Sequence, residues 1–89
     1  MVNTLGSGFN NPFGVAVDGS GNVFVGDSRN NAVKEILALG GYTTVNTFGS
    51  GFNGPSGVAV DGSGNVFVAD SSNNAVKQIY FIFRNGFEP

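Results

Sequence analysis

The chain has 89 residues, a formal net charge of −2 from four basic and six acidic side chains, and only 11% charged residues. It has no basic patch able to neutralise several phosphates, so nucleic-acid binding is not expected. Cysteine and histidine are absent, which excludes disulfides, thiolate or imidazole metal ligands, and a nucleophile–histidine pair within this chain. No stretch approaches the roughly 18 apolar residues of a membrane span, so no membrane association is predicted.

The first predicted elements, in chain order, are short strands. Val2–Leu5 resembles an outer strand that has lost its beginning, because its first three residues recur at Val45-Asn46-Thr47. Two β-rich runs follow, at Val15–Asp18 and Asn22–Val25. The glycine-containing segment Gly19-Ser20-Gly21 between them predicts a tight hairpin.

Two further strands complete the predicted unit. A cluster of turn-forming residues occupies positions 27–31 and precedes a run at Ala32–Leu37. The last run, Tyr42–Phe48, follows Gly40-Gly41. The glycines, the β-branched residues and the two-residue alternation predict four short antiparallel strands in each unit rather than helices.

The unit occurs twice, with a period of 43 residues. Residues 2–36 and 45–79 align over 35 positions and are identical at 29 of them. The six differing pairs are Leu5/Phe48, Asn11/Gly54, Phe13/Ser56, Gly26/Ala69, Arg29/Ser72 and Glu35/Gln78. Self-similarity at a period of 20–50 residues is typical of solenoids, propellers and arrays.

Each predicted sheet has two apolar faces. Val23 and Val25 point to one side of their strand and Phe24 to the other. A strand with one side in water would instead alternate apolar with polar residues. Small four-stranded sheets that are covered on both sides are typical of the stacked blades of a propeller.

The pattern P-x-G-V-A-V-D-x-x-G-N-V-F-V-x-D-x-x-N-N-x-V resembles the NHL repeat, and the preceding GGYTTVNTFGSGF resembles the segment that joins two such repeats. The resemblance implies an all-β fold of two four-stranded antiparallel β-propeller blades, usually part of a ring of six. We divide the chain into a first blade at 1–39, which begins inside an outer strand, a second blade at 40–81 and a C-terminal tail at 82–89.

Two blades alone would leave two apolar sheet faces in water. Burying one valine or phenylalanine contributes roughly 1.5–3 kcal/mol, whereas a whole domain is stable by only about 5–15 kcal/mol. We therefore expect the chain to close a ring with copies of itself, as a cyclic homo-oligomer. Propellers have about four to eight blades, which allows dimers, trimers or tetramers. The six blades that the resemblance implies favour a homotrimer.

Two acidic turns are candidate sites. Asp18 to Asn22, and its copy Asp61 to Asn65, begin like a calcium loop but lack its glycine and its bidentate glutamate, so a hairpin turn is favoured. Asp27 and Asp70 could form a ring of carboxylates at a channel rim. We favour a structural role, in which each accepts backbone hydrogen bonds in its own turn, because both copies have the same loop.

The loops at one end of the predicted ring form the candidate surface for a protein or small-molecule ligand. Three of the six differing pairs fall in these loops, and loops on a rigid scaffold often carry binding sites. An equally good explanation of the three differences is that loops tolerate substitution. The candidate residues are Asn11, Phe13, Asp27, Arg29, Asn30, Gly54, Ser56, Asp70, Ser72 and Asn73.

The sequence favours a non-catalytic binding and assembly scaffold with no cofactor and no metal. The alternative is an enzyme, a lyase or hydrolase with a metal in the central channel, as the resemblance implies for some members. Without histidine, such chemistry would rest on Asp27, Asp70 or Glu35. Lys34 and Lys77 are expected to be solvated.

The last ten residues, Tyr80–Pro89, depart from the repeat. They are expected to cover a strand edge that would otherwise promote aggregation. Their ending also resembles the F-x-x-G-F-E ends of some exported bacterial proteins, which suggests an exported parent. The start, MVNTLGSG, lacks the features of a signal peptide, so localisation is left open.

Overall fold

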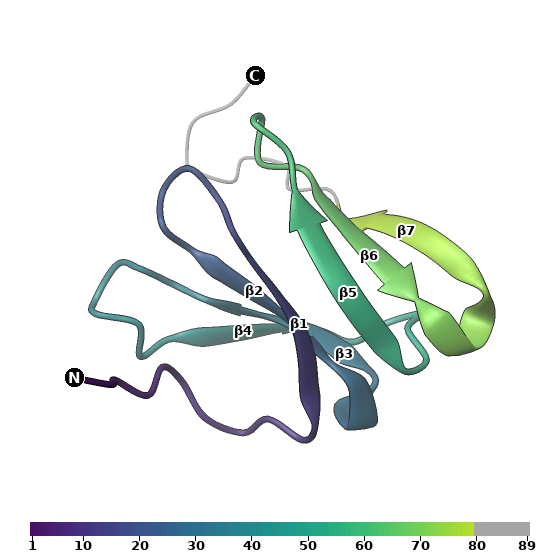
Figure 1. Ribbon diagram of the computed structural model, residues 1–89, viewed down its shortest axis with the longest axis horizontal. Helices are drawn as coiled ribbons and strands as arrows, with labels where there is room; N and C mark the ends of the chain where they lie inside the picture. The colour runs from purple at the N-terminus through teal and green to yellow at the C-terminus, as the bar shows by residue number, and fades with distance from the viewer. Residues whose placement is uncertain (80–89) are drawn as a thin grey trace.

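The computed structural model describes residues 1–79, which form two antiparallel sheets joined by loops (Figure 1). The first sheet has the order β1 (Pro12–Val17), β2 (Val23–Asp27), β3 (Ala32–Ile36) and β4 (Val45–Phe48), and the second has the order β5 (Pro55–Val60), β6 (Val66–Asp70) and β7 (Ala75–Ile79). Within residues 1–79 the helical segments are two 3-10 turns, η1 (Ser28–Asn30) and η2 (Ser71–Asn73). No helix in this part of the chain is long and apolar enough to span a membrane. The predicted all-β fold of two antiparallel sheets is confirmed.

The sequence repeat and the sheet are offset by one strand. The predicted division began the second blade at residue 40, whereas β4 pairs with β3 in the first sheet. This strand is also shorter than predicted, because Tyr42 has a positive φ of 67° and lies in the turn before it. The second sheet has three strands among the described residues, and the predictions for Tyr80–Pro89 lie outside them.

Residues 2–5 do not form the predicted outer strand. Their counterpart β4 is a strand because β3 of the same sheet lies beside it and supplies its hydrogen-bond partners. Within residues 1–79, no strand pairs with residues 2–5. A strand needs a neighbour to satisfy its backbone N–H and C=O groups, so the sequence of this segment alone does not make it one.

The hairpin between β1 and β2 is closed by its own aspartate. The Asp18 Oδ1 accepts hydrogen bonds from the backbone N–H groups of Ser20 and Asn22, both at 2.9 Å. The copy at Asp61 accepts the equivalent bonds from Ser63 and Asn65 at the same distance. These contacts confirm that both acidic segments are hairpin turns.

The strand register places apolar side chains on both faces of the first sheet. Val15 lies opposite Val25 and Ala16 lies opposite Phe24, so the valines share one face and Phe24 occupies the other. The core lies between the two sheets, where Phe24 and Val33 of the first blade pack with Val66 and Val68 of the second.

The two blades meet where β5 lies against β1 and β2. β1 and β5, the first strand of each sheet, lie next to each other, while β4 and β7 lie on the far sides (Figure 1). A Cβ atom built on Gly26 would lie 2.2 Å from the carbonyl oxygen of Ser56, so this position accepts no side chain without movement. Two hydrogen bonds also join the blades: the Ser28 hydroxyl donates to the Pro55 carbonyl at 2.6 Å, and the Gly54 N–H donates to the Asn31 Oδ1 at 2.9 Å.

Candidate functional site

The predicted loops do meet at one end of each blade. The loop before β1 contacts the loop after β2 through a hydrogen bond from the Arg29 N–H to the Asn10 carbonyl at 3.1 Å. The second blade repeats this contact, from the Ser72 N–H to the Asn53 carbonyl, also at 3.1 Å. The structure therefore gathers the candidate residues of each blade at its η-turn end.

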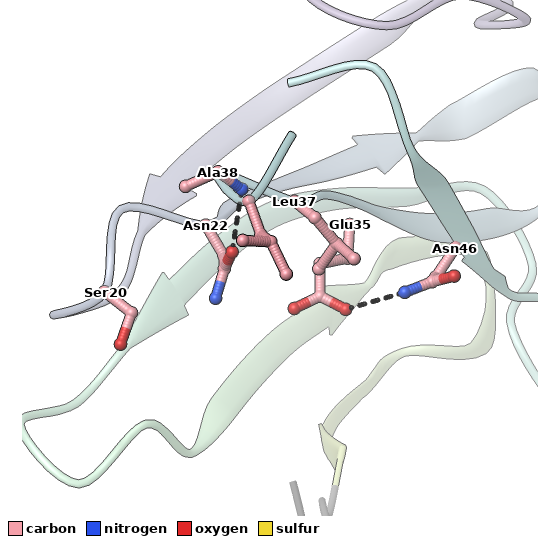
Figure 2. A pocket seen from close by; sticks show the side chains of 7 residues that line it. Ser20, Asn22, Glu35, Leu37, Ala38 and Asn46 are labelled. Carbon is pink, nitrogen blue, oxygen red and sulfur yellow. Dashed lines mark hydrogen bonds between the residues drawn. The ribbon is translucent and has the colours of Figure 1, made fainter. Parts of the chain in front are cut away.

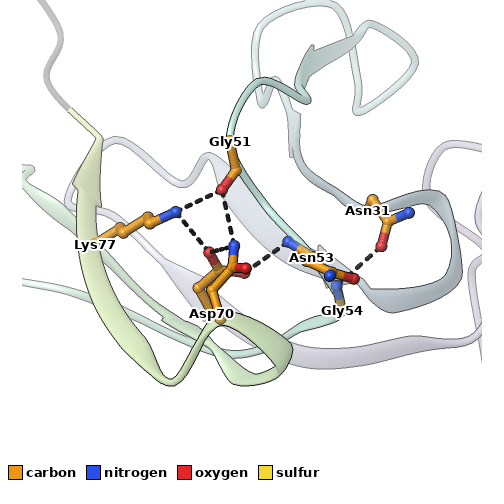
Figure 3. Close-up of polar contacts among 7 residues, drawn as sticks. Asn31, Gly51, Asn53, Gly54, Asp70 and Lys77 are labelled. Carbon is orange, nitrogen blue, oxygen red and sulfur yellow. Dashed lines mark hydrogen bonds and ion pairs between the residues drawn. The ribbon is translucent and has the colours of Figure 1, made fainter.

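A buried aspartate organises each loop cluster, and Figure 3 shows the cluster around Asp70 of the second blade. In the second blade, the Asp70 carboxylate accepts a hydrogen bond from the Asn53 N–H at 2.7 Å and another from the Asn73 side-chain amide at 2.7 Å. The Lys77 ammonium lies 2.8 Å from the same carboxylate and also donates to the Gly51 carbonyl. One carboxylate therefore connects the strand, the η-turn and the incoming loop.

The first blade holds the same network with matching partners. Asp27 accepts hydrogen bonds from the Asn10 N–H and the Asn30 side chain, both at 2.7 Å, and lies 3.0 Å from the Lys34 ammonium. Lys34 also donates to the Gly8 carbonyl at 2.6 Å. The two aspartates accept backbone hydrogen bonds as predicted, but the donors lie in the preceding loop and not in the aspartate's own turn, where the partner is an asparagine side chain.

These contacts keep both aspartates ionised. Burial alone would raise the pKa of Asp70, but the hydrogen bonds from Lys77, Asn53 and Asn73 outweigh it and lower the pKa to about 2. Burial also raises the pKa of Asp27, but the contacts with Asn10, Asn30 and Lys34 outweigh this effect and lower the pKa below its ordinary value of 3.8. Each carboxylate is therefore a charged anchor for its loop.

The prediction that the two lysines are solvated holds only in part. The side chains of Lys34 and Lys77 are 12% and 39% exposed, and each makes an ion pair with a fully buried aspartate. A signal for this pairing was present in the sequence. Strands β2 and β3 are joined by a tight turn, which brings Asp27 and Lys34 to neighbouring positions on the same face of the sheet.

The ten predicted surface residues fall into two groups. Six are exposed: Asn11, Phe13, Arg29, Asn30, Ser72 and Asn73. The other four have structural contacts. Asp27 and Asp70 are buried, the Gly54 N–H donates to Asn31 of the other blade, and the Ser56 hydroxyl lies 2.6 Å from the Ser71 hydroxyl. Ser28 and Asn31, which join the blades, were missed because their partners lie in the other repeat.

A pocket lies away from these loops, beside the β1–β2 hairpin (Figure 2). Within it, Asn22 accepts a hydrogen bond from the Ala38 N–H at 2.9 Å, and the Asn46 side chain donates to the buried Glu35 carboxylate at 3.4 Å. Its lining residues are Ser20, Asn22, Glu35, Leu37, Ala38, Leu39 and Asn46. In residues 1–79, no three His, Cys, Asp or Glu side chains are grouped so that they could hold a metal ion.

Comparison with known families agrees with this geometry. The model of the NHL repeat matches residues 9–36 and again residues 52–79, which together make up more than half of the chain. A search of curated proteins gives no match. Each matched segment includes the first three strands of its sheet and the residues just before them, where the N–H group of Asn10 or Asn53 binds the aspartate. The chain therefore belongs to the NHL-repeat family, whose repeats form the blades of β-propellers.

Proposed function

We propose that this chain is a non-catalytic propeller module that closes a ring with copies of itself and offers the loops of one ring face to a protein or small-molecule ligand. Three chains would supply the six blades of such a ring. The observation that carries the proposal is the difference in exposure between the two blades, which leaves one apolar face of each blade without a covering sheet.

The uncovered face of the first blade contains Val15 and Val17, which are 60% and 58% exposed. The uncovered face of the second blade contains Val76, which is 77% exposed. Together we name them the end faces of the chain. Large apolar side chains grouped on a surface favour a protein–protein contact.

The contact inside the chain supplies a template for covering both end faces. Val33, the counterpart of Val76, is fully buried between the blades. Val58 and Val60, the counterparts of Val15 and Val17, pack against the same core. A second copy that sets its Val15 and Val17 against Val76 would therefore repeat a contact that this sequence already makes.

The polar contacts between the blades can be repeated in the same way. Asn11 and Gly54 share nearly the same φ, 59° and 60°, so the backbone at Asn11 is already shaped like its partner in the other repeat. The counterparts of the four residues that join the blades are all exposed: Asn11, Pro12, Ser71 and Asn74. Head-to-tail contacts that close by rotation produce a ring.

The ligand surface proposed for the ring is the set of exposed candidate residues, whose largest side chains in the first blade are Phe13 in β1 and Arg29 in η1. They lie beside the loops that Asp27 and Asp70 fix in place, and a rigid base favours binding because little conformational freedom is lost. The alternative, an enzyme with a metal in the channel, has less support, because Asp27 and Asp70 already bind lysines, amides and backbone N–H groups.

The test is the mass of the protein in solution. By light scattering we expect the mass of three chains for the unchanged protein and of one chain for Val76→Lys, because a charge on an end face cannot be buried without a partner. The matched control is Leu39→Lys, a change at an exposed apolar residue outside the end faces, which should leave the mass of three chains. A folded protein with the mass of one chain before any substitution would overturn the proposal.

A further inference from the structure

The pocket beside the β1–β2 hairpin is large enough for a small organic molecule. It encloses about 480 Å³, and ligand pockets in proteins typically measure about 300–1,000 Å³. All of its lining residues belong to the first blade, where they lie in the hairpin, in β3, in the loop after β3 and in β4. The hairpin lies at the end of β2 opposite to η1. The pocket is therefore separate from the loop surface proposed above.

Hydrogen bonds fix the loop that forms one side of the pocket. The Ala38 N–H donates to the Asn22 Oδ1 at 2.9 Å, which ties the loop to the hairpin. The Leu37 N–H donates to the Thr44 carbonyl at 3.0 Å. The Gly41 N–H donates to the Ala38 carbonyl, also at 3.0 Å. A ligand that enters the pocket would not have to order this loop, and binding to a preformed site loses less conformational freedom.

The base of the pocket carries a carboxylate. Glu35 is 1% exposed, whereas Ser20 and Leu39 at the rim are exposed. Figure 2 shows the Glu35 carboxylate accepting a hydrogen bond from the Asn46 side chain, at 3.4 Å. A carboxylate has about four acceptor positions, so Glu35 can bind Asn46 and the donors of a ligand together. Because little water reaches this carboxylate, it attracts a cation more strongly than a carboxylate on the open surface does.

The charge of the pocket is specific to the first repeat. Glu35 corresponds to Gln78 in the second repeat, which is neutral. The other polar lining residues are the same in both repeats: Ser20, Asn22 and Asn46 match Ser63, Asn65 and Asn3. Since β3 and β7 are both strands, the backbone at this position accepts either a glutamate or a glutamine. The strand does not require the negative charge, which instead determines the charge of the ligand that the pocket accepts.

Leucine side chains line the pocket beside the carboxylate. Leu37 is half-buried, and Leu39 is 86% exposed. A ligand with an aliphatic part would remove some of this apolar surface from water, which favours binding. The lining therefore suits a molecule that has a positive charge at one end and a short carbon chain.

We infer that this pocket binds a small aliphatic primary amine. The ammonium group of the amine has three N–H donors and pairs with the Glu35 carboxylate. Its carbon chain contacts Leu37 and Leu39. Because every lining residue belongs to one blade of one chain, the site does not depend on the proposed ring.

A titration with butylammonium, followed through the backbone amide signals of isotope-labelled protein by NMR, tests the site. We expect saturable shifts at the residues around the pocket. Butanol and butyrate have the same carbon chain without a positive charge and should give no saturable shift at the same concentration. Glu35→Gln introduces the residue of the second repeat and should weaken butylammonium binding by about tenfold or more, because hydrogen bonds to charged groups are the stronger kind.

The matched control is Asp61→Asn, which removes the same charge at an exposed hairpin turn of the second blade. Butylammonium binding that is weakened in Glu35→Gln and unchanged in Asp61→Asn supports the site. The inference is overturned by the absence of a saturable shift, by equal binding of butanol or butyrate, or by equal effects of the two substitutions. Where Glu35→Gln does not fold, the comparison of butylammonium with butyrate on the unchanged protein decides. The ring has its own test in the mass of the protein, so either proposal can fail alone.

Discussion

The two blades have nearly the same sequence but different surroundings. Val33 is fully buried and its counterpart Val76 is 77% exposed, although both lie in strands that begin AVK. The valines before the hairpins show the reverse, since Val58 and Val60 pack on the core while Val15 and Val17 are exposed. Position in the stack, rather than the residues themselves, decides which valine is buried.

The comparison also shows where the blades are not interchangeable. Gly26 faces the Ser56 carbonyl across the contact inside the chain, whereas its counterpart on the end face is Ala69. The methyl group of Ala69 would meet the Phe13 carbonyl of a neighbouring copy at the same short distance. In the proposed ring, the valine packing could be repeated between copies, but the backbones at Ala69 would have to lie further apart than those at Gly26 do within the chain.

The largest effect is expected for Gly26→Ala. Its Cβ would lie 2.2 Å from the Ser56 carbonyl oxygen, a backbone atom that cannot move alone. Overpacking of this kind typically costs about 1–3 kcal/mol, and we expect the upper part of that range in the free energy of unfolding, measured by urea titration. Ala69→Gly is the matched control and should stabilise any assembly. Equal losses from the two changes would contradict the distinction between the junctions.

The next effect is expected at the paired valines. Val33→Ala removes buried methyl groups from the core and should lower the free energy of unfolding by roughly 2 kcal/mol. Val76→Ala should change the unfolding of the single chain by less than about 0.5 kcal/mol, as exposed positions do, yet weaken the ring. Urea titrations at low and high protein concentration separate the two effects. A Val76→Ala loss that does not depend on concentration would show that Val76 is not at a contact between copies.

A smaller effect is expected from acid. The pKa of Asp70 is about 2 in the folded chain, against an ordinary value of 3.8, so the unfolded chain binds more protons between these values. Stability due to this group is therefore present above about pH 4 and is lost as the pH falls toward 2. Asp70→Asn should flatten this part of the curve of urea midpoint against pH. The Asn65 side chain also lowers the pKa of Asp61 at the exposed hairpin turn, so Asp61→Asn should flatten the curve as well, but less than Asp70→Asn does. An unchanged slope in Asp70→Asn would contradict the assignment.

Much of the fold could be predicted because its signals are local. The alternation around Phe24, the glycine turns and the repeat are sufficient for antiparallel strands with two apolar faces. The hairpin aspartates were also correctly interpreted, because Asp18 and its partners Ser20 and Asn22 lie within five residues of one another.

The rest depended on distances between segments. The pairing of Lys34 with Asp27 required the register of β2 and β3, and the contacts of Ser28 and Asn31 required the position of the other blade. Residues 2–5 were predicted to form a strand because their sequence repeats that of β4. A strand also needs a neighbouring strand to pair with, as β4 pairs with β3, and the local sequence does not show whether such a neighbour is present.

The smallest effect is expected where the repeats differ on the loop surface. Phe13 is 72% exposed, so Phe13→Ser should change the free energy of unfolding by no more than about 0.5 kcal/mol. The reverse change, Ser56→Phe, removes a hydroxyl that lies 2.6 Å from the Ser71 hydroxyl and should cost more, about 1 kcal/mol. Urea titration of both variants measures the difference. If Phe13→Ser were the more damaging, Phe13 would be part of a packed contact, and the ligand surface would have to be placed on the remaining exposed loop residues.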